Sequence, residues 1–168
     1  MKRIILFSML ALAPALFAEP AAGLRQLDYM IGRWTGTSSG EPGEGTVERE
    51  CKLLLNDRFL ECRSTVTYPP QEKNAKGEVH VELSLYSFDR KSGKLRLRQF
   101  HGEGFVNTYE EGEPLIFTTV QIENIPPGYR ARETTRQRDP DSIEETFELA
   151  EPGKEFAVYS VSTLRRMK

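Results

Sequence analysis

The stretch Gly32-Arg33-Trp34-Thr35-Gly36 contains the only tryptophan of this 168-residue chain. It follows an apolar segment, residues 24–31, whose pattern fits a short α-helix or 3₁₀-helix. Glycine on both sides of the indole allows another part of the chain to approach closely. One large aromatic side chain can plug an end of a closed sheet, because its burial removes roughly 150–250 Å² from water. The alternative is that Trp34 is an ordinary core residue, and the number of strands decides between the two.

From residue 31 onward, apolar and polar residues alternate in segments that are separated by Gly, Pro, Asn and Asp. Segments joined by short turns form an antiparallel meander. About ten strands in one sheet are better closed than left with two exposed edges. We therefore predict an all-β fold, an antiparallel up-and-down barrel of about ten strands with a short N-terminal capping helix. The predicted strands are 31–38, 45–55, 58–68, 78–89, 94–101, 105–110, 114–123, 129–138, 142–150 and 155–165.

The two cysteines, Cys51 and Cys62, lie on either side of a predicted hairpin turn at residues 56–57. Counting outward from that turn places the two cysteines directly opposite each other, within disulfide-bonding range. The alternative is a pair of buried free thiols. We expect a structural disulfide, and the absence of a Cys-x-x-Cys pattern argues against a redox-active one.

The N-terminal segment has the pattern of a secretory signal peptide. Lys2 and Arg3 precede an apolar run, and small residues follow it, with Ala18 the expected cleavage point. A membrane anchor would need about 20 apolar residues, and this run is shorter. We therefore predict a signal peptide at 1–18, a flexible segment at 19–23, and an exported protein, periplasmic or secreted.

Charge limits the partners of the remaining chain. Without Lys2 and Arg3, 21 basic residues stand against 25 acidic ones, a net charge of about −4. No basic block indicates nucleic-acid binding, and no basic amphipathic helix indicates a membrane surface. We expect neither a nucleic-acid partner nor membrane insertion after removal of the signal peptide, and the oligomeric state stays open.

Taken together, the capping segment, the Gly-x-Trp-x-Gly motif of residues 32–36, the ten meander strands and the basic last strand resemble the calycin β-barrels, the superfamily of lipocalins and fatty-acid-binding proteins. Only residues 39–44 separate the first two strands, which leaves no room for the helical pair of fatty-acid-binding proteins. The resemblance is therefore closest to nitrobindin-like barrels and related uncharacterised secreted bacterial barrel proteins. It implies that 24–168 form one barrel domain, closed at one end by Gly32, Trp34 and Gly36 with Arg165 or Arg166 lying across the indole.

A closed barrel of this size has room for one small ligand. We predict an exported barrel that binds a small, mainly hydrophobic molecule without transforming it. His101 shares a strand face with apolar neighbours and precedes two glycines, so it is expected to point inward near a barrel mouth. The predicted ligand-binding residues are Trp34, His101, Phe105, Tyr109 and Tyr129.

The remaining polar residues give no strong site pattern. His80 has the opposite parity from Val79 and Val81, so it is expected outside the barrel. Glu133 and Glu145 share parity with apolar neighbours, and inward carboxylates there would have raised pKa values. No His-x-His or clustered His/Cys set is present, and we expect no metal site and no resident cofactor.

Two other functions remain as alternatives. The resemblance to nitrobindins implies a haem-binding barrel with weak redox or nitric-oxide chemistry, in which His101 would be the haem ligand. Nitrobindins use a histidine late in the chain, however, and none follows His101 here. The other alternative is a structural or partner-binding protein with a filled core. His101 and Glu103 are two residues apart, so they could share a pocket as an acid/base pair. No other catalytic constellation is found, and we do not predict an enzyme.

Overall fold

The computed structural model describes residues 23–168. The predicted signal peptide, 1–18, and all but the last residue of the segment 19–23 lie outside the described residues. Among residues 23–168, no helix is both long enough and apolar enough to cross a membrane.

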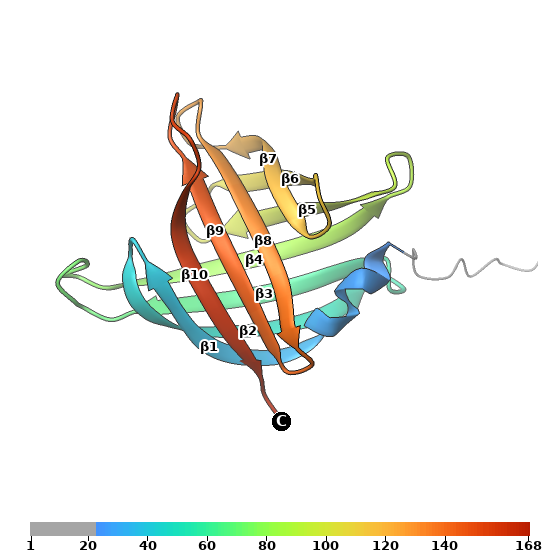
Figure 1. Cartoon of the computed structure of the whole chain (residues 1–168), viewed down its shortest axis with the longest axis horizontal. Coiled ribbons are helices and arrows are strands. Elements are labelled where there is room, and N and C mark those ends of the chain that lie inside the picture. The colour runs from blue at the N-terminus through green and yellow to red at the C-terminus, as the bar shows by residue number, and fades with distance from the viewer. Residues whose placement is uncertain (1–22) are drawn as a thin grey trace, which may run out of the picture.

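The fold is a closed antiparallel barrel of ten strands preceded by a short 3₁₀-helix (Figure 1). Each strand pairs with its neighbours in sequence, and β1 pairs with β10 to close the sheet. The predicted fold is therefore confirmed, and each predicted strand boundary lies within two residues of the observed one. The elements are η1 (Leu24–Met30), β1 (Gly32–Gly40), β2 (Gly43–Leu54), β3 (Phe59–Tyr68), β4 (Glu78–Asp89), β5 (Lys94–His101), β6 (Val106–Glu111), β7 (Ile116–Glu123), β8 (Arg130–Asp139), β9 (Ser142–Ala150) and β10 (Ala157–Arg166).

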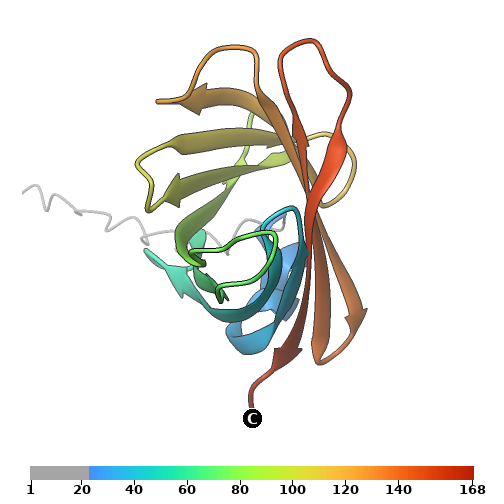
Figure 2. The same ribbon diagram turned by 90° about the vertical axis from the view of Figure 1, so that its left-hand side faces the viewer.

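Helix η1 covers one end of this barrel. Leu24, Leu27 and Met30 are buried in the core. Because successive strands run in opposite directions, the connections alternate between the two ends, and the β1–β2, β3–β4, β5–β6, β7–β8 and β9–β10 hairpins gather at the other end. In Figure 2 the β1–β2 and β3–β4 hairpins face the viewer, and η1 lies behind them. We refer to the hairpin end as the mouth and to the η1 end as the capped end.

Trp34 fills the capped end. Its side chain is fully buried, and its Nε1–H donates to the carbonyl oxygen of Met30 at 2.7 Å. The guanidinium of Arg166 lies over the indole, 4.2 Å from its ring centroid, and donates to the carbonyl oxygens of Tyr29 and Ile31. Arg165, the other candidate for this position, is exposed on the outside. Cation–π stacking therefore ties the last strand to the first, and two charge-assisted hydrogen bonds tie it to η1 and to the residue between η1 and β1.

Each glycine of the Gly-x-Trp-x-Gly motif is required for a different structural reason. A Cβ on Gly36 would lie 1.9 Å from the carbonyl oxygen of Thr163 on β10, so only glycine allows this close strand approach. Gly32 has φ +124°, and a Cβ there would lie 2.8 Å from the Arg166 guanidinium. Both glycines thus permit the closure that the motif predicted.

The predicted disulfide is present. Cys51 on β2 and Cys62 on β3 are direct cross-strand partners with Cα atoms 4.1 Å apart, and they form a disulfide. Leu55, Asn56 and Asp57 all have positive φ in the connecting turn, which brings the two strands into this register.

Replacing both cysteines, Cys51→Ala with Cys62→Ala, is expected to lower the free energy of unfolding by about 2–3 kcal/mol. The reason is that the bond closes a loop with a sequence separation of 11 residues, which removes chain entropy from the unfolded state. Urea denaturation of both proteins under non-reducing conditions measures the difference. A reduced wild type that unfolds at the same urea concentration as the oxidised one would contradict it.

The side of β4 that points into the barrel is the opposite of the predicted one. Val79 and Val81 are 59% and 50% exposed, whereas His80 and Glu82 point into the barrel. The cause is the register with β3, since directly opposed residues share a face and His80 and Glu82 stand opposite the inward-facing Val66 and Ser64. The prediction that His80 lies outside is therefore wrong, and the polar face of β4 lines the interior.

Candidate functional site: a cavity with a charged floor

The barrel encloses a cavity of about 510 Å³ between the core of the capped end and the mouth. Its lining is chemically mixed. We call ten of its polar side chains the floor and nine of its apolar or aromatic side chains the apolar wall, and Pro42, Glu78, Glu103, Tyr159, Ser160 and Ser162 complete the lining. The floor consists of Ser38, Arg49, Ser64, Tyr68, His80, Glu82, His101, Asn107, Glu133 and Glu145, and the apolar wall of Val66, Phe105, Ile122, Ile125, Pro126, Tyr129, Ala131, Phe147 and Leu149. The alternative of a filled core is not observed, because the interior contains this cavity.

Strands β7 and β8 pair over a short length beside the apolar wall. Their ladder consists of three residue pairs and ends at Thr118 and Arg132. Beyond it, the Thr119 hydroxyl accepts from the Ala131 amide at 2.9 Å and donates to the Ala131 carbonyl at 3.2 Å. A side chain thus takes over the backbone pairing, and the two strands diverge toward the mouth.

Arg49 and Glu145 form a buried ion pair across the floor. Their side chains are 9% and 8% exposed, and Nη1 of Arg49 donates to Oε1 of Glu145. Nε of Arg49 also donates to the Ser64 hydroxyl at 2.8 Å. Burial disfavours the charge of Arg49, but the adjacent Glu145 carboxylate outweighs it and holds the pKa of Arg49 above its ordinary value. Sequence reasoning missed Arg49, although it shares parity with the inward-facing Val47 and Cys51.

Glu133 is a buried carboxyl that holds its proton at neutral pH. It accepts a hydrogen bond from Nε2 of Gln99 at 2.7 Å. Burial, followed by the nearby carboxylates of Glu145 and Glu82, raises the pKa of Glu133 to about 8. Burial likewise raises the pKa of Glu82, whose carboxylate accepts from the Ser84 hydroxyl. The inward placement predicted for Glu133 and Glu145 is confirmed, and the floor can both donate and accept hydrogen bonds.

Glu133 is expected to lower the stability of the protein as the pH rises toward 8, and Glu133→Gln is expected to reduce this decline. The lowered pKa of His101 acts in the opposite direction below about pH 6.5, so the decline of the wild type is clearest between about pH 6.5 and pH 8. A carboxyl with a folded pKa of about 8 and an ordinary value of 4.5 binds its proton more tightly in the folded state. Its contribution is therefore complete below about pH 4.5 and declines by up to about 1.4 kcal/mol per pH unit as the pH rises toward 8. Urea denaturation of both proteins at pH 5, 6, 7 and 8 measures this. Parallel pH profiles of the two proteins would contradict the assignment.

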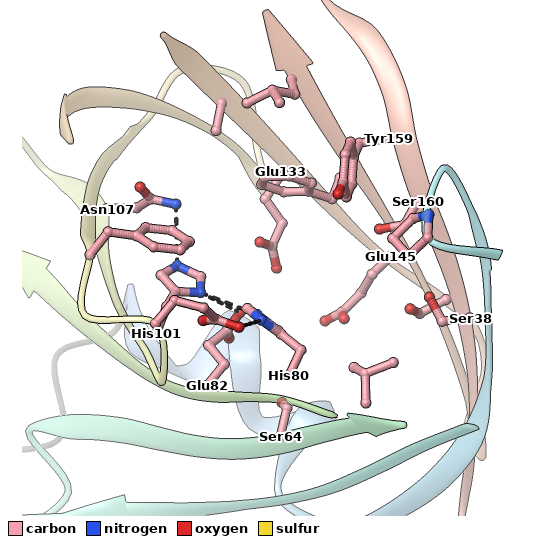
Figure 3. A pocket seen from close by; sticks show the side chains of 18 of the residues that line it. Ser38, Ser64, His80, Glu82, His101, Asn107, Glu133, Glu145, Tyr159 and Ser160 are labelled. Carbon is pink, nitrogen blue, oxygen red and sulfur yellow. Dashed lines mark hydrogen bonds and ion pairs between the residues drawn. The ribbon is translucent and has the colours of Figure 1, made fainter. Parts of the chain in front are cut away.

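Two histidines and a carboxylate gather on one side of the cavity, as Figure 3 shows. Nδ1 of His101 lies 3.2 Å from Nε2 of His80 and 4.0 Å from Oε2 of Glu82. Nδ1 of His80 is 2.8 Å from Oε1 of Glu103, and the amide of Asn107 is 3.3 Å from Nε2 of His101. Burial, followed by the neighbouring His80, lowers the pKa of His101 to about 4, so His101 is neutral at neutral pH.

The structure brings together some of the predicted ligand-binding residues. His101, Phe105 and Tyr129 line the cavity, with the His101 ring stacked on Phe105 at a centroid distance of 4.0 Å. Trp34 and Tyr109 are not part of the lining. Trp34 fills the capped end, and Tyr109 is fully buried in the core, where its hydroxyl accepts from Asn107. The ligand-binding roles of the three lining residues stay predictions.

The expectation of no clustered ligand set needs correction, because His80, Glu82 and His101 place one ligand atom each within 4.8 Å of one another. The sequence carried a signal for this cluster, His80-x-Glu82 on one strand face, but the outward placement of His80 concealed it. The possible acid/base pair of His101 with Glu103 does not form, since the Glu103 carboxylate contacts His80 instead.

The residues around His101 do not fit a haem group. A haem iron needs an accessible imidazole nitrogen beside an apolar space for the macrocycle. In this structure Nδ1 faces His80, Nε2 faces Asn107, and the cavity beside them is bordered by the charged floor. The haem alternative is thus left without support from this geometry.

Comparison with known proteins shows similarity at the level of structure. No family model and no curated protein sequence matches the chain. The crystal structure of Rv2717c from M. tuberculosis superimposes with a TM-score of 0.62 at 17% identity, covering 88% of this chain and 98% of that one. The S-type phycobiliprotein lyase CPES from Guillardia theta gives a TM-score of 0.51 at 13% identity, covering 86% and 92%. The similarity is one of fold.

Proposed function

We propose that this protein is an exported, calycin-like binding protein that holds one small amphipathic molecule in its barrel without transforming it. The observation that carries the proposal is the cavity of about 510 Å³, which lies in the usual range for small-molecule sites. Its apolar wall favours an apolar body, and its floor favours polar groups at one end of the ligand. This ligand class replaces the mainly hydrophobic one expected from the sequence, because sequence reasoning placed the polar face of β4 outside.

Export is part of the same proposal. The Cys51–Cys62 disulfide is typical of proteins in oxidising compartments, and the signal-peptide pattern at 1–18 agrees with this. The resemblance to nitrobindin-like barrels rests on the Gly-x-Trp-x-Gly motif and on the short connection between the first two strands.

The test is uptake of N-phenyl-1-naphthylamine, a neutral fluorescent probe with an apolar body and one N–H donor. The purified protein is expected to bind it with a stoichiometry of one. Val66→Trp, which fills the cavity from β3, should weaken binding at least tenfold. Val79→Trp is the matched control, because the same substitution on the outer face of β4 leaves the cavity unchanged.

Two results would overturn the proposal: no uptake by the folded wild type, or equal uptake by both tryptophan variants. Native mass spectrometry of protein purified from the periplasm of an expression host adds an independent readout, since a bound host molecule would appear as an adduct that Val66→Trp lacks.

A further inference from the structure

We infer that His80, Glu82 and His101 form a binding site for one divalent transition-metal ion on the floor of the cavity. No part of this inference depends on the proposed binding of an organic ligand. It rests on the geometry of three side chains, on the groups that orient them and on the charge around them.

The first argument is the distance between the two histidine nitrogens. Metal–nitrogen bonds to imidazole are about 2.0–2.1 Å long, so two such ligands at bond angles of about 90–110° are separated by about 2.9–3.4 Å. Nδ1 of His101 and Nε2 of His80 are 3.2 Å apart. Glu82 completes the set, and its Oε2, at 4.0 Å from His101 Nδ1, needs only a small side-chain rotation to reach the same ion.

The second argument is that rigid elements supply all three ligands. His80 and Glu82 are two residues apart on β4 and therefore point to the same face. His101 is the direct cross-strand partner of Glu82 on β5. Strand pairing thus fixes the three Cα positions, which is what a preorganised site requires.

The third argument is the set of groups behind the histidines. Metal-bound histidines usually hold their second ring nitrogen against a carboxylate or another polar group, and this orients the ligand. Glu103 contacts Nδ1 of His80 at 2.8 Å, which directs Nε2 to the site. The amide of Asn107 lies at Nε2 of His101, and its Oδ1 is buried with no hydrogen-bond partner among the described residues. Turning that amide over places Oδ1 against His101 Nε2–H and the Tyr109 hydroxyl, which leaves Nδ1 as the ligand atom.

The fourth argument is charge. Arg49, the one guanidinium of the floor, is paired with Glu145 and so does not pair with Glu82. A bound cation would supply Glu82 with an opposite charge. Two imidazoles and one carboxylate suit Zn²⁺, Fe²⁺ or Co²⁺, whereas Mg²⁺ and Ca²⁺ prefer oxygen ligands throughout. Because the three ligands lie on one side of the cavity, the other coordination positions face the space that holds the proposed ligand.

The test uses tag-free protein stripped with a chelator and titrated with Co²⁺ and Zn²⁺. We expect one Co²⁺ per chain with visible absorption bands, displaced by an equivalent of Zn²⁺, and no competition from a large excess of Mg²⁺. His80→Ala and His101→Ala should each weaken binding at least 100-fold, and Glu103→Gln by about 10–100-fold, since Glu103 acts through His80. Glu82→Gln should also weaken metal binding. Glu133→Gln is its control and should leave metal binding unchanged, because it removes a neighbouring carboxyl outside the cluster.

Nuclear magnetic resonance of the wild type provides a measurement that does not depend on the folding of a variant. The chain has two histidines, so their four ring nitrogens give an unambiguous spectrum. Zn²⁺ should shift Nε2 of His80 and Nδ1 of His101. Unchanged ring nitrogens at saturating Zn²⁺, or Co²⁺ affinities of both alanine variants equal to that of the wild type, would refute the site. Uptake of N-phenyl-1-naphthylamine by metal-free protein keeps the two proposals separable.

Discussion

Trp34→Ala is expected to lower the free energy of unfolding by about 3–5 kcal/mol. The indole is fully buried, so the substitution removes its apolar contacts and leaves a cavity that the rigid strands cannot close. It also removes the surface on which Arg166 stacks and the hydrogen bond to Met30. Far-UV circular dichroism during urea denaturation measures the loss, because the variant has no tryptophan for fluorescence.

Trp34→Phe is the matched control for this substitution. It keeps an aromatic ring under Arg166 and loses the Nε1–H bond, so we expect a loss of about 1–2 kcal/mol. Probe uptake by folded Trp34→Phe should match the wild type, since Trp34 does not line the cavity. A loss under 1 kcal/mol for Trp34→Ala would mean that the indole does not hold the capped end together.

Arg49→Met is expected to destabilise the protein by about 3–5 kcal/mol. Both members of the Arg49–Glu145 pair are buried, and removing the cation leaves the carboxylate without compensation near Glu82 and Glu133. Denaturation at pH 7 measures the effect. The surface pair of exposed Arg138 and half-buried Glu144 supplies the control, since Arg138→Met should cost about 1 kcal/mol or less.

The double variant Arg49→Met with Glu145→Gln tests the cause. It should be more stable than Arg49→Met alone, because the uncompensated buried charge is gone. Additive losses from the two single variants would instead show that each side chain acts through packing, independently of its partner.

The sequence predicted the strands well because each hairpin has its own local signal. The turn at residues 56–57 indicated the β2–β3 register, because counting outward from it pairs the residues of the two strands. The disulfide followed from that register. The Gly-x-Trp-x-Gly motif indicated the closure at the capped end, where Gly36 allows the approach of β10. The choice between Arg165 and Arg166 needed the strand register, which pairs Trp34 with Arg166.

The site was harder to predict because its residues break the rule that apolar side chains face inward. On β4 the valines face solvent and the histidine and glutamate face the cavity, so hydrophobic parity gave the wrong face. The register with β3 overrides the local pattern, and such departures concentrate where a fold holds a functional site.

By itself, the sequence determined the barrel, its strand order, its disulfide and its aromatic plug, because these depend on contacts between neighbouring strands and on turn chemistry. Only the tertiary structure decided what the interior contains. Arg49 meets Glu145 across a sequence separation of 96 residues, and His101 meets His80 through strand pairing. Barrel closure brings such distant side chains together and removes them from water, and this burial gives the floor its ion pair and its protonated Glu133.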